Sequence, residues 1–297
     1  MSAVFGPAGS AESFKAMGYK KSTQLPEYLK KFDLTHFEYQ CGQGVRRSKS
    51  GSAGMPRISE DSAREIGEAF RNAGMTLSLH APYFISLSGT DEEKRLNSIN
   101  YILASAKAAK AMGAQRIVIH SGSCAKISRE EAMELAKDTM KKARAALIAE
   151  GLEDIICCPE TMGKVNQLGT LEEVIEICKI DDTFLPTVDF GHLNARTFGG
   201  IKTKQDYADM LDKLENGLGI ERARKFHSHF SKIMFTEKGG EKMHLTFADN
   251  QGFGPDYEPL MELIAERDWS PTFICESAGT QTEDARTMQD YYNSVRK

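Results

Sequence analysis

The fold is decided by the stretch Thr187-Val188-Asp189-Phe190-Gly191-His192-Leu193-Asn194. We predict that a buried strand, Phe184 to Val188, ends here and gives way to a loop. An acid and a histidine then lie three residues apart at the end of a strand, and both are common ligands of divalent transition metals. A plainer interpretation is that Asp189 caps the next segment and His192 is a solvated loop residue.

The same kind of strand ending recurs along the chain, between amphipathic helical segments. Strands are predicted at Ala3–Phe5, Leu34–Tyr39, Thr76–His80, Arg116–His120, Asp154–Pro159, Phe184–Asp189, Lys225–Phe230 and Thr272–Glu276. Helices are predicted at Leu25–Lys31, Glu60–Ala73, Glu92–Met112, Arg129–Glu150, Leu171–Lys179, Lys204–Leu214, Tyr257–Glu266 and Thr282–Ser294. This alternation indicates a parallel sheet with helical crossovers.

Both an open doubly wound sheet and a closed barrel fit the alternation. In an open sheet the polar residues gather at one switch point, whereas here nearly every strand ends in one, as expected when all the loops surround a single mouth. We therefore predict a single-domain α/β protein, a (β/α)₈ TIM barrel over residues 1–297. Two loop insertions are expected, at about 41–58, glycine-rich and basic, and at about 231–256, where Gly239-Gly240 suggests a hairpin.

The composition excludes several classes of protein. With 40% hydrophobic and 27% charged residues and a net charge of −4, the chain is neither disordered nor globally suited to a polyanion, although a local basic surface could bind one. It has no run of about 18 apolar residues and no leader pattern, so we expect a cytoplasmic protein without membrane association. The six cysteines form no Cys-x-x-Cys pair. A monomer is expected.

Ionisable side chains end the predicted strands one after another. They are His80, His120, Glu160, Asp189 with His192, His229, His244 in the second insertion, and Glu276. A charge at the end of a buried strand is costly unless it is paired or bound to a metal. Since one zinc ion uses about four ligands, two or three metals are more economical for this set than one.

Three further residues on the strands are less clearly placed. His227 lies two residues before His229 and faces the same side, one layer deeper, so it is either a hydrogen-bond partner or, as we favour, a plain core histidine. His36 is early in its strand and is given no role. Glu38 could reach the interior but is equally a structural acid in an ion pair.

The order His, His, Glu, Asp-x-x-His, His, His, Glu on successive strand ends resembles the endonuclease IV family, abasic-site DNA endonucleases with three zinc ions on a (β/α)₈ barrel. The strongest local match is Glu160-Thr161-Met162-Gly163-Lys164-Val165-Asn166-Gln167-Leu168-Gly169. The resemblance implies that His80, His120 and Glu160 hold a first zinc and that Glu160 bridges to a second, completed by Asp189, His229 and Glu276. It assigns His192 and His244 to a third.

The resemblance also implies a reaction and a surface for DNA. Paired metals about 3.5–4 Å apart would activate a bridging water and clamp the phosphate in an in-line displacement, cleaving double-stranded DNA 5′ to an abasic site. Tyr83 and Phe84 follow the first histidine, where the family places an aromatic wedge. The expected phosphate contacts are Arg46, Arg47, Lys49 and Lys164. The implied cofactor is Zn²⁺, two to three per chain, and the same ligands also accept Mn²⁺ and iron.

The sequence departs from the family in two places. Where the family has an aspartate two residues before its last histidine, this chain has Lys242, with Glu241 one residue further away. The first strand, Val4-Phe5-Gly6-Pro7-Ala8-Gly9, lacks the family's usual histidine. A divergent member with an altered substrate is therefore also compatible with the sequence.

Two other functions remain open. A sugar isomerase or epimerase of the related xylose isomerase-like barrels needs one metal, which Glu160, Asp189, His229 and Glu276 would hold. That reading leaves the other four strand-end histidines unexplained. A non-catalytic binding barrel that keeps its metals for structure would melt in a metal-dependent way without turnover.

Overall fold

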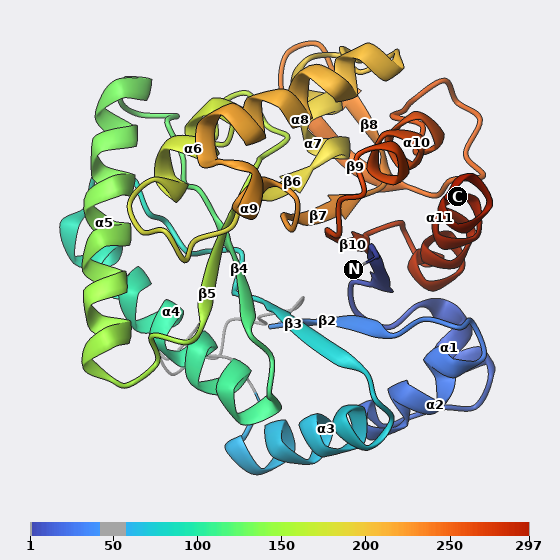
Figure 1. Ribbon diagram of the computed structural model, residues 1–297. Helices are drawn as coiled ribbons and strands as arrows, with labels where there is room; N and C mark the ends of the chain where they lie inside the picture. The colour runs from blue at the N-terminus through green and yellow to red at the C-terminus, as the bar shows by residue number, and fades with distance from the viewer. Residues whose placement is uncertain (1, 42–57, 297) are drawn as a thin grey trace.

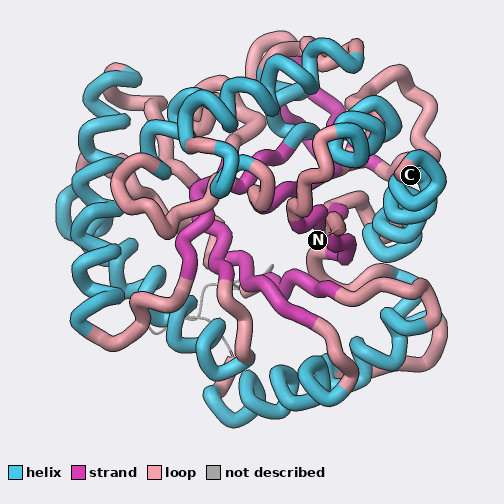
Figure 2. Tube along the Cα trace, viewed as in Figure 1, coloured by secondary structure: helices cyan, strands magenta, loops and turns pink. Residues whose placement is uncertain are grey.

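The structure is a computed structural model that describes residues 2–41 and 58–296. Eight parallel strands form one sheet in the order β1-β10-β7-β6-β5-β4-β3-β2, and helices surround it (Figures 1 and 2). The strands are β1 (Val4–Pro7), β2 (His36–Gln40), β3 (Thr76–His80), β4 (Arg116–His120), β5 (Ile156–Glu160), β6 (Thr187–Asp189), β7 (His227–Phe230) and β10 (Thr272–Cys275). The predicted (β/α)₈ architecture is confirmed.

The two ends of the sheet meet between β1 and β2. A parallel bridge joins Ala8 to Glu38, and the Gly9 amide donates to the Glu38 carbonyl at 3.0 Å. The approach is so close that a Cβ on Gly6 would lie 2.1 Å from the carbonyl oxygen of His36. Glycine at this position therefore allows the barrel to close.

The helices around the sheet are α1 (Glu12–Ala16), α2 (Leu25–Lys30), α3 (Glu60–Asn72), α4 (Glu92–Met112), α5 (Arg129–Ala149), α6 (Leu171–Cys178), α7 (Phe190–Arg196), α8 (Lys204–Leu218), α9 (Ile220–Ala223), α10 (Glu258–Glu266) and α11 (Gln281–Val295), with a 3₁₀ turn η1 (Ser22–Gln24). Helices α3 to α8 each begin at a polar side chain that caps the first turn. Asp91, for example, accepts the Lys94 amide at the start of α4, and Gly113 ends that helix in the left-handed conformation.

Several predicted bounds are confirmed, and the stretch around Asp189 is corrected. The strands Thr76–His80 and Arg116–His120 and the helix Glu92–Met112 have the predicted ends. Strand β6 ends at Asp189, as predicted, but begins at Thr187 instead of Phe184, and Asp189 directly caps α7, accepting the His192 amide at 2.7 Å. The predicted loop at His192 is therefore helical, and His192 is buried, so its interpretation as a solvated residue is wrong.

The second insertion forms the predicted hairpin, made of β8 (Lys232–Thr236) and β9 (Gly240–Leu245), which packs against α7. Nearly all of the first insertion lies outside the described residues. The predicted phosphate contacts Arg46, Arg47 and Lys49 belong to that part.

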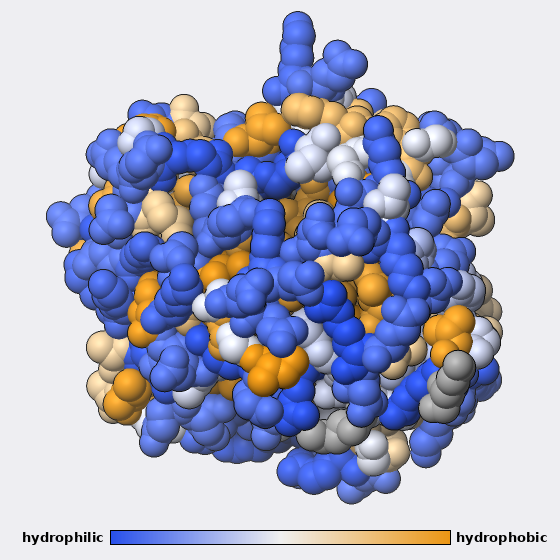
Figure 3. Space-filling model, turned by 45° about the horizontal axis from the view of Figure 1, so that its top comes forward, coloured by the Kyte–Doolittle hydropathy of each residue, from blue (hydrophilic) through white to orange (hydrophobic). Residues whose placement is uncertain are grey.

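The apolar core lies mainly between the outside of the barrel and the helices, where residues such as Leu77, Leu79 and Ile117 point outward from the strands. A separate apolar cluster of Val118, Cys158 and Leu185 packs with Ile156 on inward-facing strand positions. On the face shown in Figure 3, hydrophobic residues form small patches among hydrophilic ones. Among the described residues, no helix is both long and apolar enough to span a bilayer.

Replacing Gly6 by alanine should destabilise the barrel, because the new methyl group would overlap the His36 backbone. We expect the free energy of unfolding in urea, followed by circular dichroism, to fall by about 3 kcal/mol. Gly239→Ala is the control, since the nearest atom to its added Cβ is Thr236 Oγ1 at 3.4 Å. Equal stability of the two variants would contradict this account of barrel closure.

Candidate metal centre

Side chains alternate along each strand, so every second residue points into the barrel. The last inward residue is His80 on β3, His120 on β4, Glu160 on β5 and Asp189 on β6. The parallel register sets His120 beside Glu160, and Asp189 beside His229. The structure thus brings together the ionisable strand ends that the sequence singles out.

These residues surround one cavity of about 380 Å³ at the mouth of the barrel. Its lining includes the predicted residues His80, Tyr83, His120, Glu160, Lys164, His192, Glu241, His244 and Glu276. Asp189 and His229 are fully buried. The sequence reasoning did not single out Gln40, Cys41, Met162 and Gln167, which also line the cavity. The sequence could have predicted Gln40 as a lining residue, because it is a polar residue that ends β2 on the same face as His36 and Glu38.

Glu160 is the hub of the cluster, and its side chain is only 1% exposed. One carboxylate oxygen, Oε1, lies 2.9 Å from His229 Nδ1 and 3.5 Å from His192 Nδ1. The other, Oε2, lies 3.4 Å from the Nε2 atoms of both His80 and His120. Four imidazoles from three strands and a helix therefore converge on one carboxylate.

Burial and these contacts shift the pKa values of the cluster in opposite directions. Burial raises the pKa of Glu160, but the contacts with His229 and His80 outweigh it and hold that pKa well below its usual range. Burial likewise lowers the pKa of His80 and His192, yet Glu160 beside the first and Asp189 beside the second bring each to about 9. Without a metal, protons balance the carboxylates, and a bound cation would displace them.

For two of the remaining members, burial is the largest influence on the pKa and sets the direction of its shift. Burial lowers the pKa of His120 to about 4 and raises the pKa of the Asp189 carboxyl group. His120 therefore already offers a neutral ring nitrogen at neutral pH, the form that binds a metal.

Two carboxylate oxygens of the cluster have unmet bonding capacity. Glu160 Oε2 and Asp189 Oδ2 are buried and have no hydrogen-bond partner among the described residues. The other oxygen of Asp189 caps α7, so this residue both starts the helix and faces the cluster. A buried carboxylate oxygen without a donor is costly, and a divalent cation would satisfy both atoms. The residues present fit a metal centre.

The ligand atoms fall into groups that lie within 4.8 Å of one another. Among the described residues these groups are His80–Glu160–His229, Glu160–Asp189–His229–Glu276, His192–Glu241–His244 and Glu38–His227–His229. The first two share Glu160 and His229. The third uses none of the same residues, which is the arrangement expected of a centre with more than one ion.

Three of the histidines are oriented by a hydrogen bond through Nδ1, although Nδ1 of His192 also lies 3.2 Å from Asp189 Oδ2. These bonds join His80 Nδ1 to the Ala81 carbonyl (2.7 Å), His192 Nδ1 to the Thr161 carbonyl (2.9 Å) and His244 Nδ1 to Ser231 Oγ (2.8 Å). Each leaves Nε2 free for a cation, as partners around metal sites commonly do.

A bulge in the hairpin explains how Glu241 joins the third group. Met243 pairs with Met234 and Glu241 pairs with Phe235, so Lys242 is an extra residue without a partner of its own in the ladder. This shift brings Glu241 Oε2 within 3.6 Å of His192 Nε2, while Lys242 is exposed. The departure at Lys242 is thus compensated by backbone geometry that the sequence did not reveal.

The predicted DNA-contacting residues at the mouth differ in their placement. Tyr83 lines the cavity and is 57% exposed, and Lys164 is an exposed residue of the same wall. Phe84 does not line the cavity. It packs edge-on against Tyr101, with ring centroids 5.0 Å apart, beside a neighbouring depression.

The chain belongs to the xylose isomerase-like TIM barrel family, whose model matches residues 26–294. This match agrees with the closed sheet and with the strand-end cluster described above.

Individual relatives point in more than one direction. The chain is 31% identical over 296 residues to the uncharacterized protein MJ0133 of Methanocaldococcus jannaschii, covering 98% of this chain and 97% of that one. It is 26% identical over 215 residues to a probable endonuclease 4 of Mycoplasma pneumoniae, covering 71% and 70%. A D-tagatose 3-epimerase-like protein of known structure shares the fold, with a TM-score of 0.71, 18% identity and 98% coverage of both chains.

Glu241→Ala should remove one metal ion per chain, because it takes the only carboxylate from the His192–Glu241–His244 group. The matched control is Lys242→Ala, next to it in the bulge and exposed, which should leave the metal content unchanged. Metal content of the purified full-length variants, measured by inductively coupled plasma mass spectrometry, checks this. Equal metal content in the two variants would show that the third group holds no ion.

Proposed function

We propose that this protein is a metal-dependent phosphodiester hydrolase that cleaves double-stranded DNA 5′ to abasic sites in base excision repair. The observation that supports it best is the gathering of three potential ligand groups around one cavity, one of them separate from the other two. A single-metal reaction does not need the His192–Glu241–His244 group.

The proposed metals are two to three Zn²⁺ ions, with Mn²⁺ as the alternative. Their ligands would be His80, His120 and Glu160; Glu160, Asp189, His229 and Glu276; and His192, Glu241 and His244. When bound, the ions would supply Lewis-acid stabilisation of a phosphate and a more acidic water.

The chain's own residues would position the substrate. A cavity of about 380 Å³ is at the small end for ligand sites, which suits a sugar that has lost its base. The exposed ring of Tyr83 offers a surface on which a flanking base can stack, or a wedge into the duplex. The ammonium group of Lys164 at the rim offers a contact to the phosphate backbone.

The alternative is a sugar epimerase with one metal at Glu160, Asp189, His229 and Glu276. The structural likeness to a D-tagatose 3-epimerase-like protein shows the fold alone. Sequence similarity to a probable endonuclease 4 and the separate third ligand group favour the hydrolase. One metal per chain together with sugar turnover would favour the epimerase.

The protein should cut a duplex that contains one abasic site, and Glu160→Gln should slow the cut by a factor on the order of 10³, because the carboxylate shared by two ligand groups becomes neutral. The measurement is cleavage of an end-labelled duplex on a denaturing gel with the zinc-loaded protein. A matched duplex without the lesion is the control. Turnover of ketohexoses with an intact abasic duplex would contradict the proposal.

Lys164→Gln should weaken binding to the duplex and lower the slope of log K against log salt by about 1, the loss expected for one phosphate contact.

Tyr83→Ala should reduce the preference for the abasic duplex while leaving the salt slope unchanged. Fluorescence anisotropy at several salt concentrations separates the two effects. Lys30→Gln, at an exposed residue that ends α2, serves as the control. An unchanged slope for Lys164→Gln would remove this residue from the DNA surface.

A further inference from the structure

A network of polar side chains inside the barrel, buried at its centre and reaching the surface at Thr76, has no part in the proposed function. Its members are Glu38 and His36 on β2, Ser78 and Thr76 on β3, Arg116 on β4, and His227 on β7. Glu38, Ser78 and His227 are completely buried. Such a network is costly in a barrel interior unless its buried polar groups are hydrogen-bonded and its charges paired.

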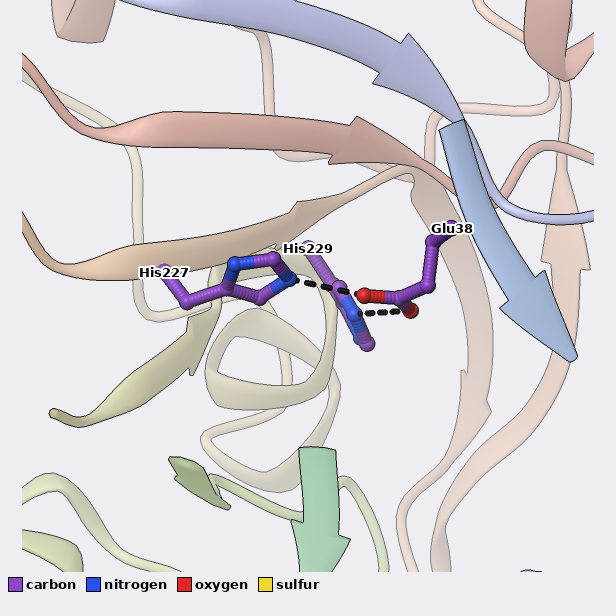
Figure 4. Close-up of side chains that lie close together, drawn as sticks. All are labelled: Glu38, His227 and His229. Carbon is purple, nitrogen blue, oxygen red and sulfur yellow. Dashed lines mark hydrogen bonds and ion pairs between the residues drawn. The ribbon is translucent and has the colours of Figure 1, made fainter. Parts of the chain in front are cut away.

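Glu38 lies at the centre of the network, with both carboxylate oxygens occupied. Oε1 accepts from His229 Nε2 at 2.8 Å, and Oε2 accepts from His227 Nε2 at 2.8 Å and from Ser78 Oγ at 2.9 Å. Figure 4 shows the carboxylate of β2 facing the two imidazoles of β7. Burial raises the pKa of Glu38, but His229 and His227 outweigh it and hold that pKa well below its usual range.

An ionised carboxylate can only accept, and this sets the direction of every bond around it. The Ser78 hydroxyl hydrogen points at Glu38, so Ser78 Oγ must accept from His36 Nε2, 3.0 Å away. Thr76 then donates to His36 Nδ1 at 2.7 Å. The interpretation of His227 as a plain core histidine is corrected, since it bonds to the carboxylate that holds His229. His36, which was given no role, is joined to the same network through Ser78.

The same logic determines which nitrogen His229 presents to the cluster. Its Nε2–H is used on Glu38, so Nδ1 is the atom that faces Glu160 Oε1 at 2.9 Å and Glu276 Oε2 at 3.6 Å. His80 and His244 instead rest on a neutral carbonyl or hydroxyl oxygen and present Nε2. His229 rests on a carboxylate, which makes an imidazole a more basic ligand.

We propose that Glu38 is a positioning residue of the metal centre: it holds His229 through Nε2 so that Nδ1 binds the ion between Glu160, Asp189 and Glu276, and it makes this the tightest of the metal positions. The proposal rests on the proposed function only in requiring a metal centre. The metal positions then differ in their affinity for zinc, and the cause is Glu38, which contacts neither the metal nor the substrate.

The test is zinc affinity of the full-length chain, measured by competition with a chromophoric chelator. Glu38→Gln keeps the size of the side chain but removes its charge, and it should weaken the tightest zinc by about 10- to 100-fold with little change in the weaker ions. Asp181→Asn is the matched control. It breaks a half-buried pair with Arg144, away from the cavity lining, and should lower the melting temperature without changing zinc affinity.

A second readout follows the ring of His229 directly. In zinc-loaded wild type, ¹⁵N-resolved imidazole spectra should show a protonated Nε2 and a metal-bound Nδ1, and Glu38→Gln should lose or shift that proton signal. If Glu38→Gln does not fold, Ser78→Ala is used instead. It removes the hydrogen bond that orients the Glu38 carboxylate, so His229 is held less firmly and the tightest zinc should weaken by a smaller factor.

The outcomes separate this inference from the function on which it rests. A wild type that binds zinc while Glu38→Gln binds it equally tightly, with His229 unchanged, would overturn the inference alone. Anomalous scattering from an ion seated between Glu38 and His227 would also overturn it, because these residues would then be ligands of a separate site. A wild type that binds no metal would overturn both proposals.

Discussion

The arrangement at the mouth of this barrel depends on one buried carboxylate, Glu160, whose negative charge must be balanced by neighbouring side chains. Glu160 is almost completely buried, and the free energy of placing an unpaired charge there is unfavourable by several kcal/mol. Its compensation comes from His80, His120, His192 and His229, on strands β3 and β4, helix α7 and strand β7. Because a shift of one residue turns a strand side chain to the opposite face, these strands must keep their register for the charges to meet.

A polar interior of this kind is tolerated because the stability of the fold comes mainly from another layer. The large apolar core lies between strands and helices, while the separate cluster on inward-facing strand positions consists of Val118, Cys158 and Leu185 with Ile156 beside them. On the side of β2, β3 and β7, Glu38 and His227 occupy positions that aliphatic side chains fill in most such barrels. Because the core between strands and helices supplies most of the stability, the interior of the barrel can carry polar and ionisable side chains.

The sequence predicts what depends on local pattern, and it fails where the outcome depends on partners far along the chain. Strand ends such as His80 and His120 follow from an apolar run that stops at a polar residue, and both were placed correctly. Helix α7 was missed because its cap, Asp189, reads equally well as a ligand in a loop. The bond between Glu38 and His227 joins residues 189 positions apart, and only the closure of the barrel at β1 and β2 brings them together.

The unequal support of the ligand groups suggests how one barrel can serve different reactions. The group of Glu160, Asp189, His229 and Glu276 would serve either a hydrolase or an epimerase, and it is backed by Glu38 from inside the barrel. The group of His192, Glu241 and His244 depends on a hairpin outside the barrel. That hairpin is joined to the loop after β5 by backbone bonds, including one from the Glu241 amide to the Gly163 carbonyl. A change in the hairpin can therefore add or remove a metal position without disturbing the strands, because Glu241 and His244 lie outside the barrel sheet.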